Sequence, residues 1–375
     1  MKPLTEKQSK KSIPNLLTNK VYHFIPGDGP NVLIQSIAMA PNLKIKILTL
    51  YCIDESVPKF CLNNRIEIES LGFTNKNLLR QSFRFLMYLY TEKPKLVFAH
   101  SFYPSLLCAL GRIFYWKATF VPVRHHNKVH IISKNKKAIL IDKLISRITA
   151  HTVGVSDAVR ETLIEQGCRA KKISVIYNGL PKINSQYLSK RTEFINEPFN
   201  LIALGRIDWQ KNYEGMLRII AKLRQDGLLV KLVILGSGNQ EYQMQLNKLQ
   251  LNLGIEDCVI WLGKQSDIYE YLDRADLFIH TAIDEACPLV LIETMIYGIP
   301  VVSSNLGGCR DVLEGFYMGF NPYDIFGFGQ AILDTLENLD ESKYYAKQIV
   351  NAVAKKFDPE LMQSRYAELS MKLLS

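Results

Sequence analysis

The sequence predicts an α/β protein made of two doubly wound domains, each built on a parallel β-sheet. Short segments rich in β-branched residues alternate with amphipathic segments along most of the chain. The short segments are apolar at nearly every position, as strands covered on both faces are. The chain has 375 residues, which is too long for one ordinary core and suits two domains of roughly 150–200 residues.

The expected strands follow one another in chain order. The first half holds seven, at residues 20–25, 44–50, 65–70, 95–100, 118–123, 150–155 and 172–178. The second half holds five, at residues 199–205, 229–236, 257–263, 275–280 and 299–304. The stretches between them, such as 77–90, 213–225 and 239–254, repeat apolar residues at helical spacing. This alternation predicts parallel sheets with helices on both faces.

The domain boundaries follow from the same pattern and from changes in composition. Residues 1–19 are predicted to form a mobile basic tail, because no apolar core follows the lysines. Residues 20–185 form the first domain, 186–198 a polar linker and 199–355 the second domain. Residues 356–375 are predicted as a C-terminal helix.

The charge is divided unevenly between the two halves. The net charge of +10 combines +18 over residues 1–190 with −8 over residues 191–375. This division favours different partners for the two halves, and a solvated charged surface is the alternative. No run of about 20 apolar residues is present. The nearest approach is 104–123, which Arg112 and Lys117 interrupt. The seven scattered cysteines indicate reduced thiols and a cytoplasmic protein.

Charged residues and glycines follow the strands of the second domain. In open α/β sheets ligands bind beyond the carboxyl ends of the strands. Glycines there allow close backbone approach, and cations favour an anionic ligand. The residues at this edge that we select as ligand-binding candidates are Arg206, Lys211, Gly236, Gly238, Lys264 and Glu285.

The segment 284–302 places two carboxylates in an otherwise apolar run. Pro288 is predicted as the first residue of a helix that ends at Gly298. The amide groups of Leu289 and Val290 then form a phosphate site at the positive end of the helix. Glu293 lies five residues past Pro288, about 7.5 Å along the helix axis, where it can reach a diol beside that phosphate. A diphosphate between hydroxyl-rich rings, as in a nucleotide sugar, fits this arrangement.

These residues resemble a known family. Glu285 and Glu293 match the E-x7-E motif of the retaining glycosyltransferases of the GT-B fold, family 4. LGRIDWQKN, VILGSGNQ and KISVIYNGL resemble further segments of that family, and the resemblance covers most of residues 150–315. Over residues 20–150 only GDGPN, FAHSFYPS and PVRHHN are similar. The family usually has Gly-Phe where this chain has Ala286-Cys287.

The resemblance implies a GT-B fold, with a cleft between two Rossmann-like domains and the C-terminal helix packing back toward the first domain. It implies transfer of a sugar from a UDP-sugar or GDP-sugar to an acceptor hydroxyl with retention of configuration and no metal. Arg206 and Lys211 would hold the diphosphate, Glu293 the ribose, and Glu285 the transferred sugar. Gly29 would contribute from the first domain, in a Gly27–Pro30 loop that departs from the usual Gly-Gly.

The segment RHHNKVH leaves more than one interpretation open. His126 and His130 have the spacing of zinc ligands, but no third ligand is evident in the sequence, so no metal site is predicted. The resemblance places a histidine opposite the donor, and we select His126 over His125. A solvated basic loop is the alternative.

Residues 128–147 mix apolar residues with lysines, including Lys134, Lys136 and Lys137. Such a surface binds anionic lipid headgroups, and an ordinary charged helix face is the alternative. We therefore expect an enzyme at the inner face of the plasma membrane. Its acceptor would be a saccharide or lipid-linked saccharide of lipopolysaccharide, capsule or exopolysaccharide synthesis. No nucleic-acid signature is present. The alternatives are a sugar-nucleotide epimerase of the same architecture and an inactive membrane-binding protein.

Overall fold

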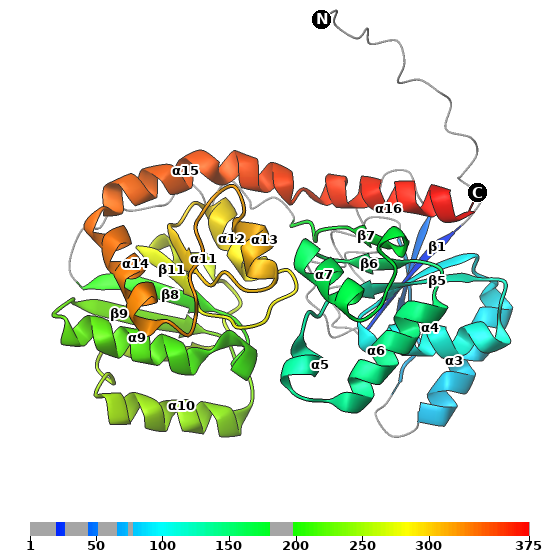
Figure 1. Ribbon diagram of the computed structural model, residues 1–375, viewed down its shortest axis with the longest axis horizontal. Coiled ribbons are helices and arrows are strands. Elements are labelled where there is room, and N and C mark those ends of the chain that lie inside the picture. The colour runs from blue at the N-terminus through cyan, green and yellow to red at the C-terminus, as the bar shows by residue number, and fades with distance from the viewer. Residues whose placement is uncertain (1–19, 27–43, 52–65, 74–77, 181–197, 375) are drawn as a thin grey trace, which may run out of the picture. The chain divides into compact units, whose positions relative to one another are not determined.

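The structure is a computed structural model that describes residues 20–26, 44–51, 66–73, 78–180 and 198–374 (Figure 1). The predicted tail, most of the predicted linker and the loop that carries Gly29 lie outside these residues. The chain divides into two compact units. One unit comprises residues 1–122 and 363–375, and the other comprises residues 123–362.

The first sheet has seven strands, in the order β3-β2-β1-β4-β5-β6-β7. Each of the seven segments predicted in the first half coincides with one of them, and only β5 extends past its segment, by one residue. They are β1 (Val21–Ile25), β2 (Ile45–Thr49), β3 (Glu67–Ser70), β4 (Leu96–His100), β5 (Thr119–Arg124), β6 (Thr152–Gly154) and β7 (Ile173–Val175). The pairs β1–β2, β1–β4, β2–β3, β5–β6 and β6–β7 are parallel. Strands β1 and β4 are buried at every residue, which explains their continuous apolar sequence.

The second sheet has five parallel strands, in the order β10-β9-β8-β11-β12. They are β8 (Phe199–Leu204), β9 (Val230–Leu235), β10 (Val259–Gly263), β11 (Leu277–His280) and β12 (Val301–Ser303). The chain moves from β8 toward one edge of the sheet and then returns to β11 on the other side. The strand order therefore reverses between β8 and β11, where ligands bind in open α/β sheets.

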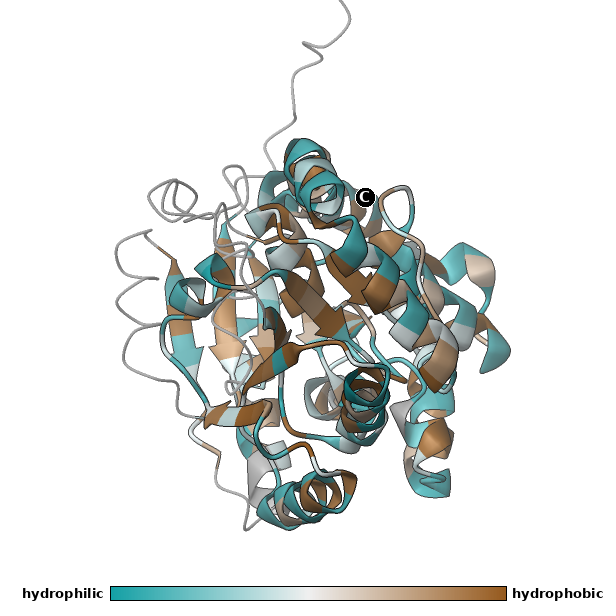
Figure 2. Cartoon of the chain, turned by 90° about the vertical axis from the view of Figure 1, so that its left-hand side faces the viewer, coloured by the Kyte–Doolittle hydropathy of each residue, from teal (hydrophilic) through white to brown (hydrophobic). Residues whose placement is uncertain are grey.

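Helices cover the sheets and supply the core. They are α3 (Leu78–Glu92), α4 (Phe102–Phe114), α5 (Val129–Ile132), α6 (Lys136–Ile148), α7 (Asp157–Glu165), α9 (Tyr213–Gln225), α10 (Gln240–Leu253), α11 (Tyr269–Asp273), α12 (Leu289–Tyr297), α13 (Gly308–Leu313), α14 (Ile325–Glu337), α15 (Leu339–Lys356) and α16 (Pro359–Leu374). Figure 2 shows apolar strands inside and hydrophilic residues on the outer helical surfaces. Helix α9 buries Leu217, Ile220 and their neighbours against β8 and β9.

Local sequence accounts for the ends of α12. Gly298 ends this helix with φ 80°, a left-handed conformation that glycine adopts readily. Pro288 precedes the helix as its N-cap, with ψ 100°. The prediction that Pro288 is the first helical residue is therefore wrong by one position. The proline carbonyl already accepts hydrogen bonds from Leu291 and Ile292, but its own backbone remains extended.

The C-terminal helix α16 carries Tyr366, which packs in the same unit as the first strands. Its ring centroid lies 5.3 Å from that of His23 and 5.0 Å from that of Phe98. Among the described residues no helix is long and apolar enough to cross a bilayer. The five cysteines in the described part of the chain are buried free thiols.

Candidate active site

The segments that follow β8 and β11 meet at the carboxyl edge of the second sheet. Lys211 ends a short 3₁₀ helix, Trp209–Lys211, which lies just beyond β8. The hydroxyl of Thr281 donates to the Lys211 carbonyl (3.0 Å), and the amide of Ile283 donates to the Gln210 carbonyl (2.8 Å). These bonds place the ammonium group of Lys211 against the carboxylate of Glu285, with which it forms a hydrogen-bonded ion pair.

The electrostatics of Glu285 follow from this pair. Burial alone would raise the pKa of Glu285, but the charge of Lys211 and the neighbouring His280 imidazole outweigh it and lower the pKa to about 2. Only 16% of the Lys211 side chain and 18% of the Glu285 side chain are exposed. Glu285 is therefore ionised at neutral pH and is available to accept hydrogen bonds from hydroxyl groups.

His280 is a site residue that the sequence analysis did not select. It is the last residue of β11, and its Nε2 lies 3.7 Å from Oε1 of Glu285. On its other side the imidazole Nδ1 faces the hydroxyl of Ser303 at 3.4 Å. Burial lowers the pKa of His280, so the imidazole is neutral at pH 7. Its place at a strand's carboxyl end was the signal that could have identified it.

The glycines of this edge bring backbone segments close together. A Cβ atom on Gly236 would lie 1.7 Å from the Gly205 carbonyl oxygen, and one on Gly238 would lie 1.9 Å from the Ile207 carbonyl oxygen. A Cβ atom on Gly205 would lie 3.1 Å from Cε of Lys211. Gly236 and Gly238 thus let the loops after β8 and β9 pack directly on each other, and Gly205 leaves room for the Lys211 side chain.

Helix α12 presents its amino-terminal turn and Glu293 on the same element. Helix geometry leaves the amides of the first turn, which include Leu289 and Val290, without intrahelical acceptors. Glu293 accepts a hydrogen bond of 3.0 Å from the hydroxyl of Tyr269 on α11. Burial raises the pKa of Glu293, and the Tyr269 hydroxyl partly offsets this effect. Tyr269, whose ring stacks on that of Tyr297, is a second residue that the sequence did not indicate.

Arg206 and Lys264 lie in more open surroundings. The guanidinium group of Arg206 is 68% exposed and pairs with Asp208 at 3.2 Å, whereas Lys211 pairs with Glu285. Lys264 is exposed just after β10. Arg206 also borders a pocket of about 420 Å³. The other residues around this pocket are Ile207, Asp208, Trp209, Asn239, Glu241, Tyr242 and Gln245.

His126 belongs to a buried charged network. Strand β5 ends at Arg124, and both Arg124 and His126 bond the same Oδ2 atom of Asp142, at 2.7 Å and 3.1 Å. Arg124 also donates to Gln166 at 2.6 Å. Burial lowers the pKa of His126, while the bond to Asp142 opposes that shift. Asp142 is the only acidic residue in the lysine-rich segment 128–147, and this isolation could have identified it from the sequence.

The same network bears on the zinc spacing of His126 and His130. The two residues do not share a helical turn, because α5 begins at Val129. The structure supplies the third group that the sequence lacked, since ligand atoms of His126, His130 and Asp142 lie within 4.8 Å of one another. Arg124 is already bonded to the Asp142 carboxylate, and its charge opposes a cation there. The arrangement favours a hydrogen-bonded network over a metal site.

A backbone contact joins the segment after His126 to the Glu285 loop. The amide of Lys128 donates to Oδ1 of Asp284 at 3.1 Å. Burial raises the pKa of Asp284, and hydrogen bonds from the Lys128 amide and from the side chains of Gln210 and Asn127 oppose that shift. The loop that carries Glu285 is thus fixed on both sides.

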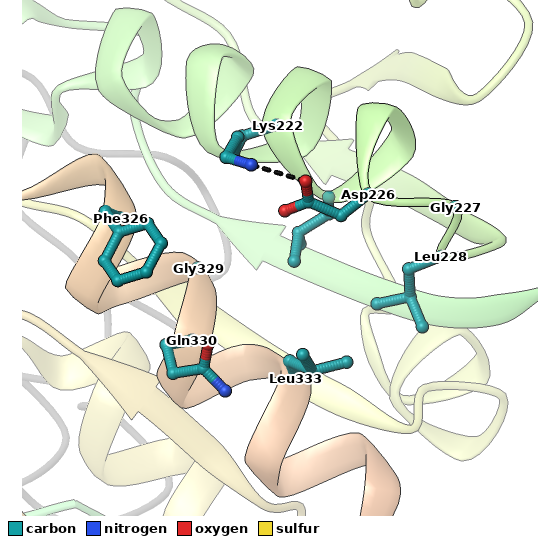
Figure 3. A pocket seen from close by; sticks show the side chains of 9 residues that line it. Lys222, Asp226, Gly227, Leu228, Phe326, Gly329, Gln330 and Leu333 are labelled. Carbon is teal, nitrogen blue, oxygen red and sulfur yellow. Dashed lines mark hydrogen bonds and ion pairs between the residues drawn. The ribbon is translucent and has the colours of Figure 1, made fainter.

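A smaller pocket of about 180 Å³ lies away from these residues. It lies where the end of α9 meets α14, and Figure 3 shows Lys222 bonded to Asp226 at its rim. None of the candidate residues named above lines it. We therefore assign it no role in the site.

Two family models match the chain. The model of glycosyl transferases group 1 matches residues 185–352, and that of glycosyltransferase family 4 matches residues 63–181. Together they cover strands β3–β7 of the first sheet, the whole second sheet and every described candidate residue. The chain belongs to the glycosyltransferases that these two models describe. Its fold is the GT-B arrangement of two Rossmann-like domains.

The individual relatives share less than 30% sequence identity with this chain over the matched segments. The chain is 29% identical over 217 residues to the amylovoran biosynthesis glycosyltransferase AmsK of Erwinia amylovora, with 56% of the chain and 52% of the relative covered. It is 25% identical over 234 residues to the lipopolysaccharide 1,6-galactosyltransferase of Escherichia coli, with 54% of the chain and 62% of the relative covered. The chain thus spans little more than half the length of these relatives.

Among solved structures, Anabaena HepE in complex with UDP-glucose has a TM-score of 0.79 at 20% identity, covering 94% of this chain and 99% of that one. The lipopolysaccharide outer core galactosyltransferase WaaB in its apo form has a TM-score of 0.71 at 20% identity, covering 94% of this chain and 99% of that one. At this level of identity the likeness supports the fold.

Proposed function

We propose that the chain transfers a sugar from a nucleoside-diphosphate sugar to a hydroxyl group of a saccharide acceptor. The observation that carries the proposal is the Lys211–Glu285 ion pair, which lies where the strand order of the second sheet reverses. A cation, an ionised carboxylate and a helix amino terminus meet at one edge of this sheet. This combination suits a ligand that has phosphates in the middle and hydroxyl groups on both sides.

Each residue then has a defined role. Lys211 and Arg206, with the first-turn amides of α12, offset the charge that develops on the leaving diphosphate. Glu293 accepts hydrogen bonds from the ribose diol, and Glu285 accepts them from the transferred sugar. Gly236, Gly238 and Lys264 line the donor site from the neighbouring strand ends. His126 approaches the transferred sugar from the segment that follows β5.

The finer chemistry follows the family resemblance. Transfer proceeds with retention of configuration, and it requires no divalent metal because Lys211, Arg206 and the helix terminus supply the positive potential. A UDP-sugar is the first donor to test, since Anabaena HepE was solved with UDP and with UDP-glucose. Activity should survive EDTA, and NMR of the product should show the anomeric configuration of the donor.

The acceptor is a lipid-linked or lipopolysaccharide-type saccharide at the inner face of the cytoplasmic membrane. The relatives named above act in amylovoran and lipopolysaccharide synthesis. A Campylobacter jejuni relative, 29% identical over 143 residues, is named for a diphospho-undecaprenol acceptor. Lys134, Lys136 and Lys137 give the contact with anionic lipid.

Ligand binding and turnover test the proposal together. Thermal shift against UDP, GDP and ADP selects the nucleotide, and transfer from the matching sugar is then measured with and without EDTA. Glu285→Gln should keep nucleotide affinity but reduce turnover at least tenfold, on the order of 1.4 kcal/mol or more. A protein that binds none of the three nucleotides would contradict the proposal. An epimerase would instead convert the donor sugar without any acceptor.

A further inference from the structure

The outer sides of helices α3 and α4 expose large apolar side chains in ordered stripes. On α3 these are Phe83, Met87 and Tyr90, which recur at four- and three-residue spacing and so lie on one side of the helix. On α4 they are Leu110, Ile113 and Phe114, beside the helix end, and Trp116 follows them. Ile113 is 72% exposed and Trp116 is 77% exposed, so neither belongs to the core.

The two stripes form one surface because the helices pack side by side (Figure 1). A Cβ atom on Gly111 of α4 would lie 3.0 Å from Cδ1 of Leu89 on α3, which shows how closely the helices approach. Near their ends the hydroxyl of Tyr90 donates to the Phe114 carbonyl at 2.7 Å. We name this surface the α3–α4 apolar face. Its members are Phe83, Met87, Tyr90, Tyr103, Leu110, Ile113, Phe114 and Trp116.

The charges around this face have one sign. Residues 82–117 contain a single acid, Glu92, which bonds to Lys46 at 3.0 Å and to Tyr22 at 3.1 Å. The remaining charged residues of this segment are cations: Arg84, Lys93, Lys95, Arg112 and Lys117. A large apolar surface with tyrosine and tryptophan and with a basic border is typical of proteins that lie in a membrane interface.

We propose that the α3–α4 apolar face inserts into the headgroup region of an anionic lipid bilayer. This explains the exposed apolar residues within 110–116, which lie between the buried part of α4 and the buried strand β5 and which the core does not account for. The proposal concerns residues other than Lys134, Lys136 and Lys137, and it adds insertion of apolar side chains to electrostatic attraction. It does not rest on the proposed transferase chemistry.

Sedimentation of the full-length chain with vesicles tests insertion without any substrate. The vesicles are phosphatidylcholine alone or phosphatidylcholine mixed with phosphatidylglycerol. We expect binding to the mixed vesicles, with part of it persisting in high salt because apolar contacts are not screened. The variant Ile113→Ser/Phe114→Ser/Trp116→Ser should bind at least tenfold more weakly. The matched control Met244→Ser/Leu251→Ser/Tyr344→Ser removes similarly exposed residues of the other unit and should bind like the wild type.

Tryptophan fluorescence gives a direct reading of insertion. Lipids brominated on their acyl chains should quench the wild-type protein, and Trp116→Phe should abolish most of that quenching. Wild-type vesicle binding by the triple serine variant, or an absence of quenching, would overturn the proposal. A lipid-free dimer that the triple serine variant converts to a monomer would also overturn it, since the face would then be a contact between copies of the chain.

Discussion

Replacing Lys211 by methionine tests the central ion pair, because methionine keeps much of the side-chain volume and removes the charge. The pKa of Glu285 lies at about 2 in the folded protein against an ordinary value of 4.5. A difference of this size corresponds to about 3 kcal/mol of folding free energy at neutral pH. Because Lys211 makes the largest attractive contribution, Lys211→Met should lower the free energy of unfolding by about 2–3 kcal/mol at pH 7.

The pH dependence of this loss has a defined sign. A carboxylate whose folded pKa is lowered stabilises the fold above its unfolded pKa, and this stabilisation disappears as the pH falls toward the folded value. The contribution of Glu285 should therefore fall from about 3 kcal/mol at pH 7 to about 1 kcal/mol at pH 3. The wild type and Lys211→Met should become more nearly equal in stability over that range.

Urea unfolding followed by tryptophan fluorescence measures this effect in the second domain. The chain has three tryptophans, so a Trp116→Phe background leaves Trp209 and Trp261 as reporters of the five-stranded sheet. Arg206→Met is the matched control: its exposed pair with Asp208 should contribute no more than about 0.5 kcal/mol. A stability difference between the wild type and Lys211→Met that is negligible at pH 7, or constant from pH 7 to pH 3, would refute the reasoning.

Three further substitutions test the surroundings of the site. Tyr269→Phe removes the hydrogen bond that its hydroxyl gives to Glu293 and should weaken nucleotide binding in calorimetry several-fold, with the melting temperature nearly unchanged. Asp142→Asn takes the carboxylate from a buried guanidinium and from His126, so thermal unfolding should show a loss of about 3 kcal/mol, and turnover should fall more than nucleotide affinity. Gly236→Ala would place a Cβ atom 1.7 Å from a carbonyl oxygen, so circular dichroism should show a loss of several kcal/mol or no folded protein.

The strands could be predicted from the sequence because their signal is local. All twelve predicted segments overlap a strand, since a strand buried on both faces must be apolar along its whole length. The position of Pro288 was wrong by one residue, because proline suits both the N-cap and the first helical position and only the dihedral angles distinguish them.

The candidate site was predictable only in part, because its contacts join distant segments. Lys211 and Glu285 lie at strand ends, and the rule for open sheets identifies both. The partner of His126 lies sixteen positions along the chain, and that of Glu293 lies on a different helix. Spacing along the sequence does not report such pairs, so the pairing of His126 with Asp142 and that of Glu293 with Tyr269 emerged only from the structure.

Arg206 and Lys211, the two cations of the candidate site, differ in how strongly each is already paired with a carboxylate. The charge of Lys211 is already balanced by Glu285, so the pair by itself adds little net attraction for a diphosphate. To bind a dianion, a cation must first break its existing ion pair, and this should cost little free energy. Arg206 meets this condition because its exposed pair with Asp208 is weak. Lys211 instead keeps Glu285 ionised and fixed in position. We therefore propose that Arg206 mainly captures the donor, whereas Lys211 holds Glu285 in place and meets the diphosphate charge as it develops during transfer.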